Sequence, residues 1–209
     1  MPTRNRVNPN GAIFATSARG TFMGNRGGAL HNDRQEIVRQ YIGHRWITCV
    51  LEFKGRQRQV MSPGLYTELF FLDEAVALAA GHRPCGECRR ERFKAFVNSW
   101  KQSTGRGRAG ALLAPEIDRE LHHARIGSRR EKITHQAPLE SLPDGCFVQI
   151  GEGSHLVWEG ALLLWSAEGY IKKEALPVGL TAAVLTPEPT VQCLRGGYRP
   201  EIHKSALGL

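Results

Sequence analysis

Residues 70–88, FFLDEAVALAAGHRPCGEC, combine a short helix signal with a pair of cysteines. Asp73 is a typical N-cap residue, an alanine-rich run follows it, and Gly81 supplies a stop, so the spacing predicts a short helix. Directly after this helix, Cys85 and Cys88 are separated by two residues. That separation lets a tight turn aim both sulfur atoms at one ion, and it is typical of one half of a tetrahedral zinc site.

The cysteine pair has a second interpretation as a redox motif. A thioredoxin-like pair needs a βαβ context, whereas a predicted helix precedes the pair here. The five cysteines are too few and too unevenly spaced for a disulfide framework: Cys49, Cys85, Cys88, Cys146 and Cys193. We therefore favour zinc over redox chemistry for this pair. We expect Cys146 and Cys193 to be core residues. We also expect the chain to be cytoplasmic, where disulfides are rare.

The segments on either side of this stretch predict strands before it and helices after it. Residues 45–53, RWITCVLEF, have the β-branched and aromatic enrichment of a strand, and Lys54-Gly55 offers a turn towards a second strand that ends at residues 66–71. Beyond the cysteines, apolar residues recur on one helical face: Phe93, Phe96, Val97 and Trp100. Pro115 begins a further predicted helix. We expect a small antiparallel sheet with helices beside it.

Charge divides the chain into two parts. The 209 residues include 28 Lys and Arg against 20 Asp and Glu, a formal net charge of +8. Residues 1–140 hold 23 of the basic and 13 of the acidic residues, whereas residues 141–209 hold 5 and 7. We expect a basic domain over 1–140 that binds an anionic partner, and a separate domain over 141–209. No run nears the roughly 18 apolar residues that cross a bilayer, so we expect no membrane partner.

Residues 141–209 have the pattern of closely spaced short strands. Turn signals such as Asp144-Gly145, Glu159-Gly160 and Glu168-Gly169 separate short apolar runs. This pattern predicts a small β-rich barrel or sandwich. The whole chain is therefore predicted to be α+β, with a small antiparallel sheet, helices and a zinc knuckle followed by a β-rich domain.

Residues 70–88 resemble the helix and cysteine knuckle of the zinc-binding module of Ada, the bacterial family that repairs methylphosphotriesters in DNA. The shared kernel is Ala-Leu-Ala-Ala-Gly, then Arg-Pro-Cys and a second cysteine. The resemblance implies a zinc-stabilised module with DNA as partner. In that family four cysteines hold zinc, and one of the earlier pair accepts the methyl group. The earlier positions fall near Lys54 and Arg58, where no cysteine stands, so Ada-type methyl transfer is not carried over.

The remaining zinc ligands have to come from outside the pair. Cys49 lies on the predicted hairpin beside the knuckle, and we predict it as the third ligand. His122 is the second choice. It and His123 are adjacent on the predicted helix and point about 100° apart, so only one of them is expected to reach the ion. The competing interpretation makes Cys49 a buried core residue and His122 a solvent-facing or core histidine.

The number of zinc ligands decides whether such a site is structural or catalytic. A closed four-ligand site leaves no position for an activated water. A three-ligand site would lower the pKa of a bound water to about 7, with Glu68, Glu87 or Glu91 as the base. A separate catalytic alternative is the amine of Pro2, which could form a Schiff base with an abasic sugar after removal of Met1.

Basic residues predict the surface that contacts nucleic acid. The first thirty residues carry four arginines and no acidic residue, and further arginines follow the knuckle and residue 103. The predicted contact residues are Arg4, Arg6, Arg19, Arg26, Arg89, Arg90, Arg106 and Arg108. We predict a zinc protein that binds DNA in damage recognition or repair, and the pattern does not separate DNA from RNA. The alternatives are a nucleic-acid hydrolase or lyase and a zinc-stabilised adaptor for other proteins.

Overall fold

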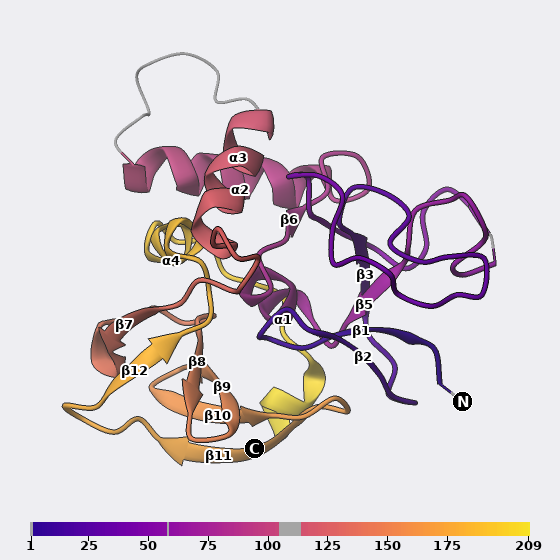
Figure 1. Cartoon of the computed structure of the whole chain (residues 1–209). Coiled ribbons are helices and arrows are strands. Elements are labelled where there is room, and N and C mark those ends of the chain that lie inside the picture. The colour runs from indigo at the N-terminus through magenta and orange to yellow at the C-terminus, as the bar shows by residue number, and fades with distance from the viewer. Residues whose placement is uncertain (1, 58, 105–113) are drawn as a thin grey trace.

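The computed structural model describes residues 2–57, 59–104 and 114–209, which form helices packed with two six-stranded sheets (Figure 1). The first sheet contains β1 (Arg4–Val7), β2 (Ile13–Ala15), β3 (Phe22–Asn25), β4 (Ile47–Cys49), β5 (Leu69–Phe71) and β6 (Arg83–Pro84). The second contains β7 (His135–Pro138), β8 (Phe147–Ile150), β9 (Gly153–Trp158), β10 (Ala161–Trp165), β11 (Tyr170–Ala175) and β12 (Thr181–Val184). The helices are α1 (Glu74–Ala79), α2 (Arg90–Thr104), α3 (Ala114–Arg125) and α4 (Glu188–Arg195), with short 3-10 turns at Leu139–Ser141 and Lys204–Gly208. The predicted α+β class is confirmed.

The first sheet is mixed, where the sequence predicted an antiparallel one. Its order is β2-β1-β5-β3-β4-β6, and the pairs β1–β5 and β4–β6 are parallel. Strand β3 lies between β4 and β5 and pairs with both, in place of the hairpin expected between residues 45–53 and 66–71. Gly24 on β3 permits this close approach, since a Cβ atom there would lie 2.2 Å from the carbonyl oxygen of Ile47.

The second sheet is antiparallel and open, in the order β11-β10-β9-β8-β12-β7. The sequence predicted either a barrel or a sandwich here, and the sheet does not close into a barrel. One face of the sheet buries Phe147, Leu156 and Leu163 against residues of the first part of the chain. Because the rest of the molecule covers that face, the sheet needs no closure to bury it.

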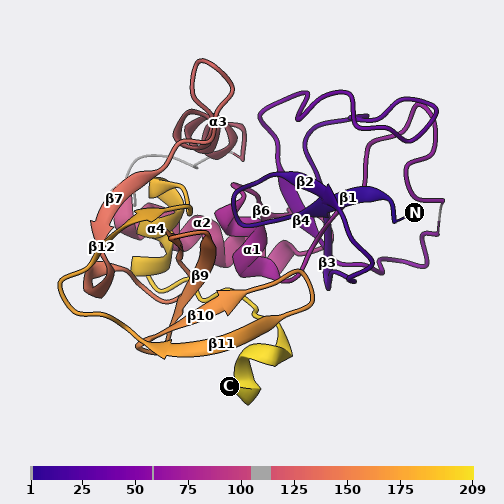
Figure 2. The ribbon, with the colours of Figure 1, turned by 60° about the horizontal axis from the view of Figure 1, so that its bottom comes forward.

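Helix α1 forms where it was predicted and lies between the two sheets (Figure 2). The side chain of Asp73 accepts a hydrogen bond from the backbone N–H of Val76 at 2.9 Å, and Gly81 follows the helix with φ +87°. Every residue of α1 is buried. Two apolar clusters pack around it, and each combines residues from before and after residue 140. The predicted segments 1–140 and 141–209 therefore share their cores.

Glu74 ties α1 to α2 and to the C-terminal segment. Its carboxylate is buried and accepts hydrogen bonds from Arg89 at 2.9 Å, from Arg92 at 2.8 Å and from the Tyr198 hydroxyl at 2.5 Å. The backbone N–H of Glu201 donates to the same carboxylate at 2.9 Å. Burial alone would raise the pKa of Glu74, but the two guanidinium groups lower it below its usual value.

No described helix is long and apolar enough to cross a membrane.

Candidate metal centre

Three cysteines that are far apart in the sequence meet at one end of the first sheet. Cys49 is the last residue of β4, Cys85 follows β6 directly, and Cys88 lies just before α2. Their sulfur atoms all lie within 4.8 Å of one another. Cys49 and Cys85 are buried and Cys88 is half-buried. The prediction that Cys49 approaches the cysteine pair is in agreement with this arrangement.

The parallel pairing of β4 and β6 positions the first two of these sulfur atoms. Ile47 lies opposite Arg83, and Thr48 lies opposite Pro84. The N–H of Cys85 donates to the carbonyl oxygen of Thr48 at 2.9 Å, so the two strands end side by side at Cys49 and Cys85. The chain then turns into α2, and this turn returns the sulfur of Cys88 to the same point.

Hydrogen bonds to sulfur already favour a thiolate at this place. The backbone N–H of Glu87 donates to the sulfur of Cys85 at 3.4 Å. The thiols of Cys49 and Cys88 hold the pKa of Cys85 well below its usual value, because both donate hydrogen bonds to its sulfur. For the same reason the pKa of Cys49, which gives up its proton least readily, is raised. The cluster therefore shares negative charge that a cation would stabilise.

The donor set and its spacing fit a metal ion. Thiolates suit Zn²⁺, Cu(I) and iron–sulfur clusters. In a tetrahedral zinc site with bonds of about 2.3 Å, the sulfur atoms lie about 3.8 Å apart, which is compatible with the observed limit of 4.8 Å. The described residues add no fourth Cys, His, Asp or Glu to the group, and residues 1, 58 and 105–113 include none of these types. A tetrahedral ion would keep one position open to an outside ligand.

No family model, no curated protein and no solved structure matches the chain. The function therefore has to be inferred from the chemistry of the site and of the surface around it.

His122, the second predicted ligand, lies in a different place. Its ring stacks on His44 with centroids 4.1 Å apart, and Arg125 approaches its Nδ1 atom at 3.3 Å. Burial, then the charge of Arg125 and the neighbouring histidines, lowers the pKa of His122 to about 4. Sequence spacing placed this histidine on a helix correctly but gave no information on which segments that helix packs against.

The three candidate bases are each held by another group. Glu68 is buried and accepts a hydrogen bond from the N–H of Met61 at 2.8 Å. Glu87 pairs with Arg56 at 2.9 Å and Glu91 pairs with Lys94 at 2.9 Å, both pairs being exposed to solvent. Of the three, only Glu87 stands in the turn between Cys85 and Cys88.

Two of the predicted nucleic-acid contacts are buried arginines. Arg26 is 2% exposed, donates to the carbonyl oxygen of Gly11 at 2.8 Å and packs over the ring of Trp46 at 4.2 Å. Arg89 is 4% exposed and forms the ion pair with Glu74. These two predictions are corrected: the Arg26 guanidinium packs on the ring of Trp46 and the Arg89 guanidinium pairs with the Glu74 carboxylate, so neither side chain faces solvent.

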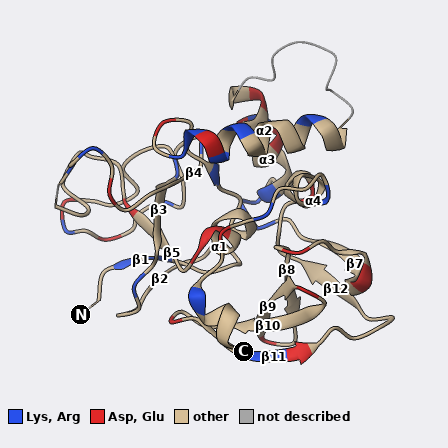
Figure 3. Ribbon diagram, turned by 180° about the vertical axis from the view of Figure 1, so that it is seen from behind, with Lys and Arg blue, Asp and Glu red and all other residues tan. Residues whose placement is uncertain are grey.

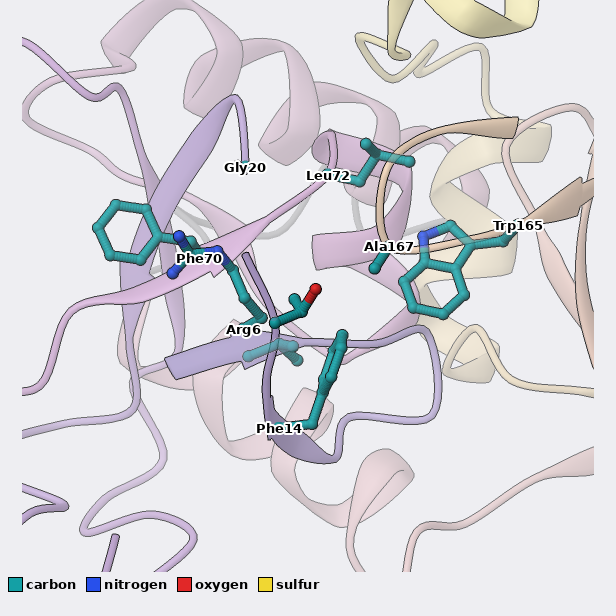
Figure 4. Close-up of a pocket in the computed structure, with 9 residues that line it drawn as sticks. Arg6, Phe14, Gly20, Phe70, Leu72, Trp165 and Ala167 are labelled. Carbon is teal, nitrogen blue, oxygen red and sulfur yellow. The ribbon is translucent and has the colours of Figure 1, made fainter. Parts of the chain in front are cut away.

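Arg6 is half-buried at the edge of a small cavity. The cavity, of about 10 Å³, lies between the ends of β1, β2 and β10 (Figure 4). Arg6 donates to the carbonyl oxygen of Ala18 at 2.7 Å and packs 4.7 Å from the ring of Phe70, and Phe14 meets Trp165 edge-to-face across the cavity. This volume suffices for about one water molecule and excludes a substrate.

The other predicted contacts are exposed or lie outside the described residues. Arg4, Arg19 and Arg90 are exposed, in agreement with a role at the surface. Arg106 and Arg108 fall within residues 105–113, outside the part of the chain that the structure describes. Figure 3 shows that Lys and Arg are spread along α2 and the loops of the first sheet.

Proposed function

We propose that the three cysteines hold Zn²⁺ and that the zinc centre stabilises a nucleic-acid-binding surface, with DNA as the expected partner. The three-cysteine group carries this proposal, because zinc is a common structural ion for thiolate sites built on a two-residue knuckle. The resemblance of residues 70–88 to the Ada module supports the same metal and the same class of partner.

The excess of positive charge supports an anionic partner. Residues 1–140 carry ten more basic than acidic residues, and this part includes exposed arginines such as Arg45, which precedes β4, and Arg90, which follows the cysteine pair. Zinc would cross-link β4, β6 and the start of α2, since one cysteine comes from each of these places. The surface that these elements expose would then be fixed before any partner binds.

Metal content tests the first half of the proposal. Elemental analysis of the purified chain is expected to find zinc, and Cys49→Ser and Cys85→Ser are expected to lose most of it and much of their thermal stability. Cys146→Ala is the matched control, because Cys146 is buried in the core outside the cysteine group. A parent protein that is folded, free of metal and fully reactive at its thiols would overturn the zinc centre.

Binding of nucleic acid tests the second half. Fluorescence anisotropy with labelled DNA is expected to show binding that weakens steeply with salt, because contacts to phosphate release counterions. Arg90→Gln, which removes an exposed charge beside the metal-binding turn, should lower the slope of log affinity against log salt by about 1. Affinity that is absent at low salt, or that does not respond to salt, would contradict a phosphate-binding surface.

A hydrolase that acts on nucleic acid is the second candidate. It is favoured by the three-ligand arrangement, since zinc supplies Lewis acidity at an open position. In this chain the carboxylate of Glu87 stands in the turn between Cys85 and Cys88, exposed to solvent and paired with Arg56, and would have to leave that pair to move a proton. Strand cleavage or base release by the zinc-loaded parent, lost in Glu87→Gln with zinc retained, would favour this candidate over binding alone.

A further inference from the structure

A second site lies where the turn at residues 43–45 faces the start of α3. The two segments line an open surface cavity of about 420 Å³. Its walls include Gly43, His44 and Arg45 on one side and Asp118 and Arg119 on the other. This volume is within the range of ligand-binding pockets.

Two backbone N–H groups of the turn point away from the protein interior. The carbonyl oxygen of Gly43 accepts a hydrogen bond from the buried Trp46 indole at 2.9 Å, and that of His44 accepts one from the guanidinium of Arg125 at 2.6 Å. All described peptide bonds are trans, so the N–H groups of His44 and Arg45 point to the opposite side. Neither donates a hydrogen bond to another described residue. Successive N–H groups of this kind make an anion-binding concavity.

The side chains around the turn add positive charge. Arg45 and Arg119 are exposed and form no ion pair in the described part of the chain. Among the described residues that line the cavity, Asp118 is the one acidic residue, and Arg83 pairs with it through two hydrogen bonds of 2.8 Å. The guanidinium groups of Arg45 and Arg119 are therefore available to an anion.

A buried group of cations lies directly behind the turn. Arg26 and Arg125 pack 4.2 and 4.0 Å from the ring of Trp46, and Lys132 donates to the carbonyl oxygen of Ala79 at 2.7 Å. None of these three cations forms an ion pair with a described carboxylate. Burial lowers the pKa of Arg26 and Arg125 to about 9. The Asp118 carboxylate raises the pKa of Arg125, but burial outweighs it, so an anion on the outer side of the turn would further stabilise this buried charge.

The Arg125 side chain connects this buried charge to the cavity. Its Nη1 atom donates to the carbonyl oxygen of Gly81 and its Nη2 atom to that of His44, while its buried Nε atom has no partner in the described residues. The same guanidinium thus fixes the orientation of the peptide that presents the N–H of Arg45.

We propose that this cavity binds a phosphate group through the N–H groups of His44 and Arg45 and the guanidinium groups of Arg45 and Arg119. The cavity shares no lining residue with the three-cysteine group, and the observations that define it do not rest on the proposed function. Only the source of the phosphate rests on the proposed function, which supplies it from the backbone of a nucleic acid. A phosphorylated small molecule presents the same chemistry.

Inorganic phosphate is the first probe. In amide NMR spectra of the full chain, titration with phosphate is expected to shift the N–H signals of His44 and Arg45. Gly43→Asp should weaken binding at least about tenfold, because it adds a carboxylate to the wall of the cavity. Gly43→Ala is its matched control, since nothing lies within 4 Å of a Cβ atom at that position. Equal phosphate affinity in the two variants, or unmoved signals in the parent, would overturn the site.

Labelled DNA and a mononucleotide then identify the source. If the nucleic-acid backbone is the ligand, Arg45→Gln/Arg119→Gln should reduce the salt slope of DNA binding by about 2, while the exposed pair Lys173→Gln/Lys204→Gln leaves it unchanged. Phosphate and mononucleotide binding without DNA binding would support the site and overturn the proposed function. DNA binding that is identical in Gly43→Asp and Gly43→Ala would overturn the site as a backbone contact and leave the proposed function standing.

Discussion

Lys132 should make the protein more stable as the pH rises from about 7 to 10.5. Its ammonium donates to the carbonyl oxygen of Ala79, and burial, followed by the charges of Arg26 and Arg125, lowers its pKa from 10.5 to about 7. In the unfolded chain the same amine keeps its proton up to about pH 10.5. Between these two values the unfolded state binds more protons than the folded state, so the free energy of unfolding increases with pH.

The size of the effect follows from the same two pKa values. One proton of difference changes the free energy of unfolding by at most about 1.4 kcal/mol per pH unit, and by a few kcal/mol in total across the window. Below pH 7 both states are protonated and Lys132 contributes no slope. Arg26 and Arg125 titrate in the same range, so a single unfolding curve does not isolate Lys132.

Urea denaturation from pH 6 to 10 separates this contribution. Lys132→Met keeps most of the apolar stem and removes the charge, and its unfolding free energy should be higher than that of the parent at pH 7. The difference should then shrink as the pH rises, whereas Lys173→Met, an exposed control, should run parallel to the parent. If the unfolding free energies of the parent and Lys132→Met run parallel over the whole pH range, the pKa of Lys132 is not lowered by burial. Lys132 would then not belong to the buried group of cations.

Three further changes probe the interior. Glu74→Gln should lower the unfolding free energy by about 3 to 5 kcal/mol at pH 7, because it leaves two guanidinium groups without their buried carboxylate. As the pH falls through the lowered pKa of Glu74, the unfolding free energy of the parent should approach that of the variant. Denaturation curves from acid to neutral pH would show this. Asp118→Asn should cost a similar amount by leaving Arg83 unpaired, and calorimetry at neutral pH would detect the lower melting temperature. Gly24→Ala should cost about 1 to 3 kcal/mol, since the new methyl group meets the Ile47 carbonyl, whereas the same change at Gly43 should be near neutral in urea titration.

The parts of the fold that depend on neighbouring residues were predictable from the sequence. Asp73 and Gly81 delimit α1 through a cap and a turn that lie within a few residues of the helix. The spacing of Cys85 and Cys88 indicates a shared ion for the same local reason. Cys49 was reached by a weaker argument, its place on a strand expected beside the knuckle, and the structure brings its sulfur to the pair.

The parts that depend on pairing between distant segments were not predictable. The position of β3 between β4 and β5 requires residues 22–25 to reach strands some twenty to fifty residues away, and no local pattern encodes that choice. The burial of Arg26 and Arg89 follows from it, because their partners Trp46 and Glu74 are distant in sequence. Counting charged residues along the sequence could not distinguish these buried arginines from Arg45 and Arg119, which the structure places at the cavity.

Strands β4 and β6 connect the two proposed sites physically. The turn of residues 43–45 leads into β4, and β4 ends at Cys49. Strand β6 begins at Arg83, which binds Asp118 of α3, and Cys85 follows the end of this strand. A metal ion held by Cys49 and Cys85 would therefore fix the far ends of the same two strands whose near ends set the walls of the phosphate cavity. Loss of metal should loosen the cavity, whereas loss of phosphate binding in Gly43→Asp should leave the metal content unchanged. This asymmetry follows because the metal would determine the spacing of the strands, while the anion would only occupy a space that the strands have already formed.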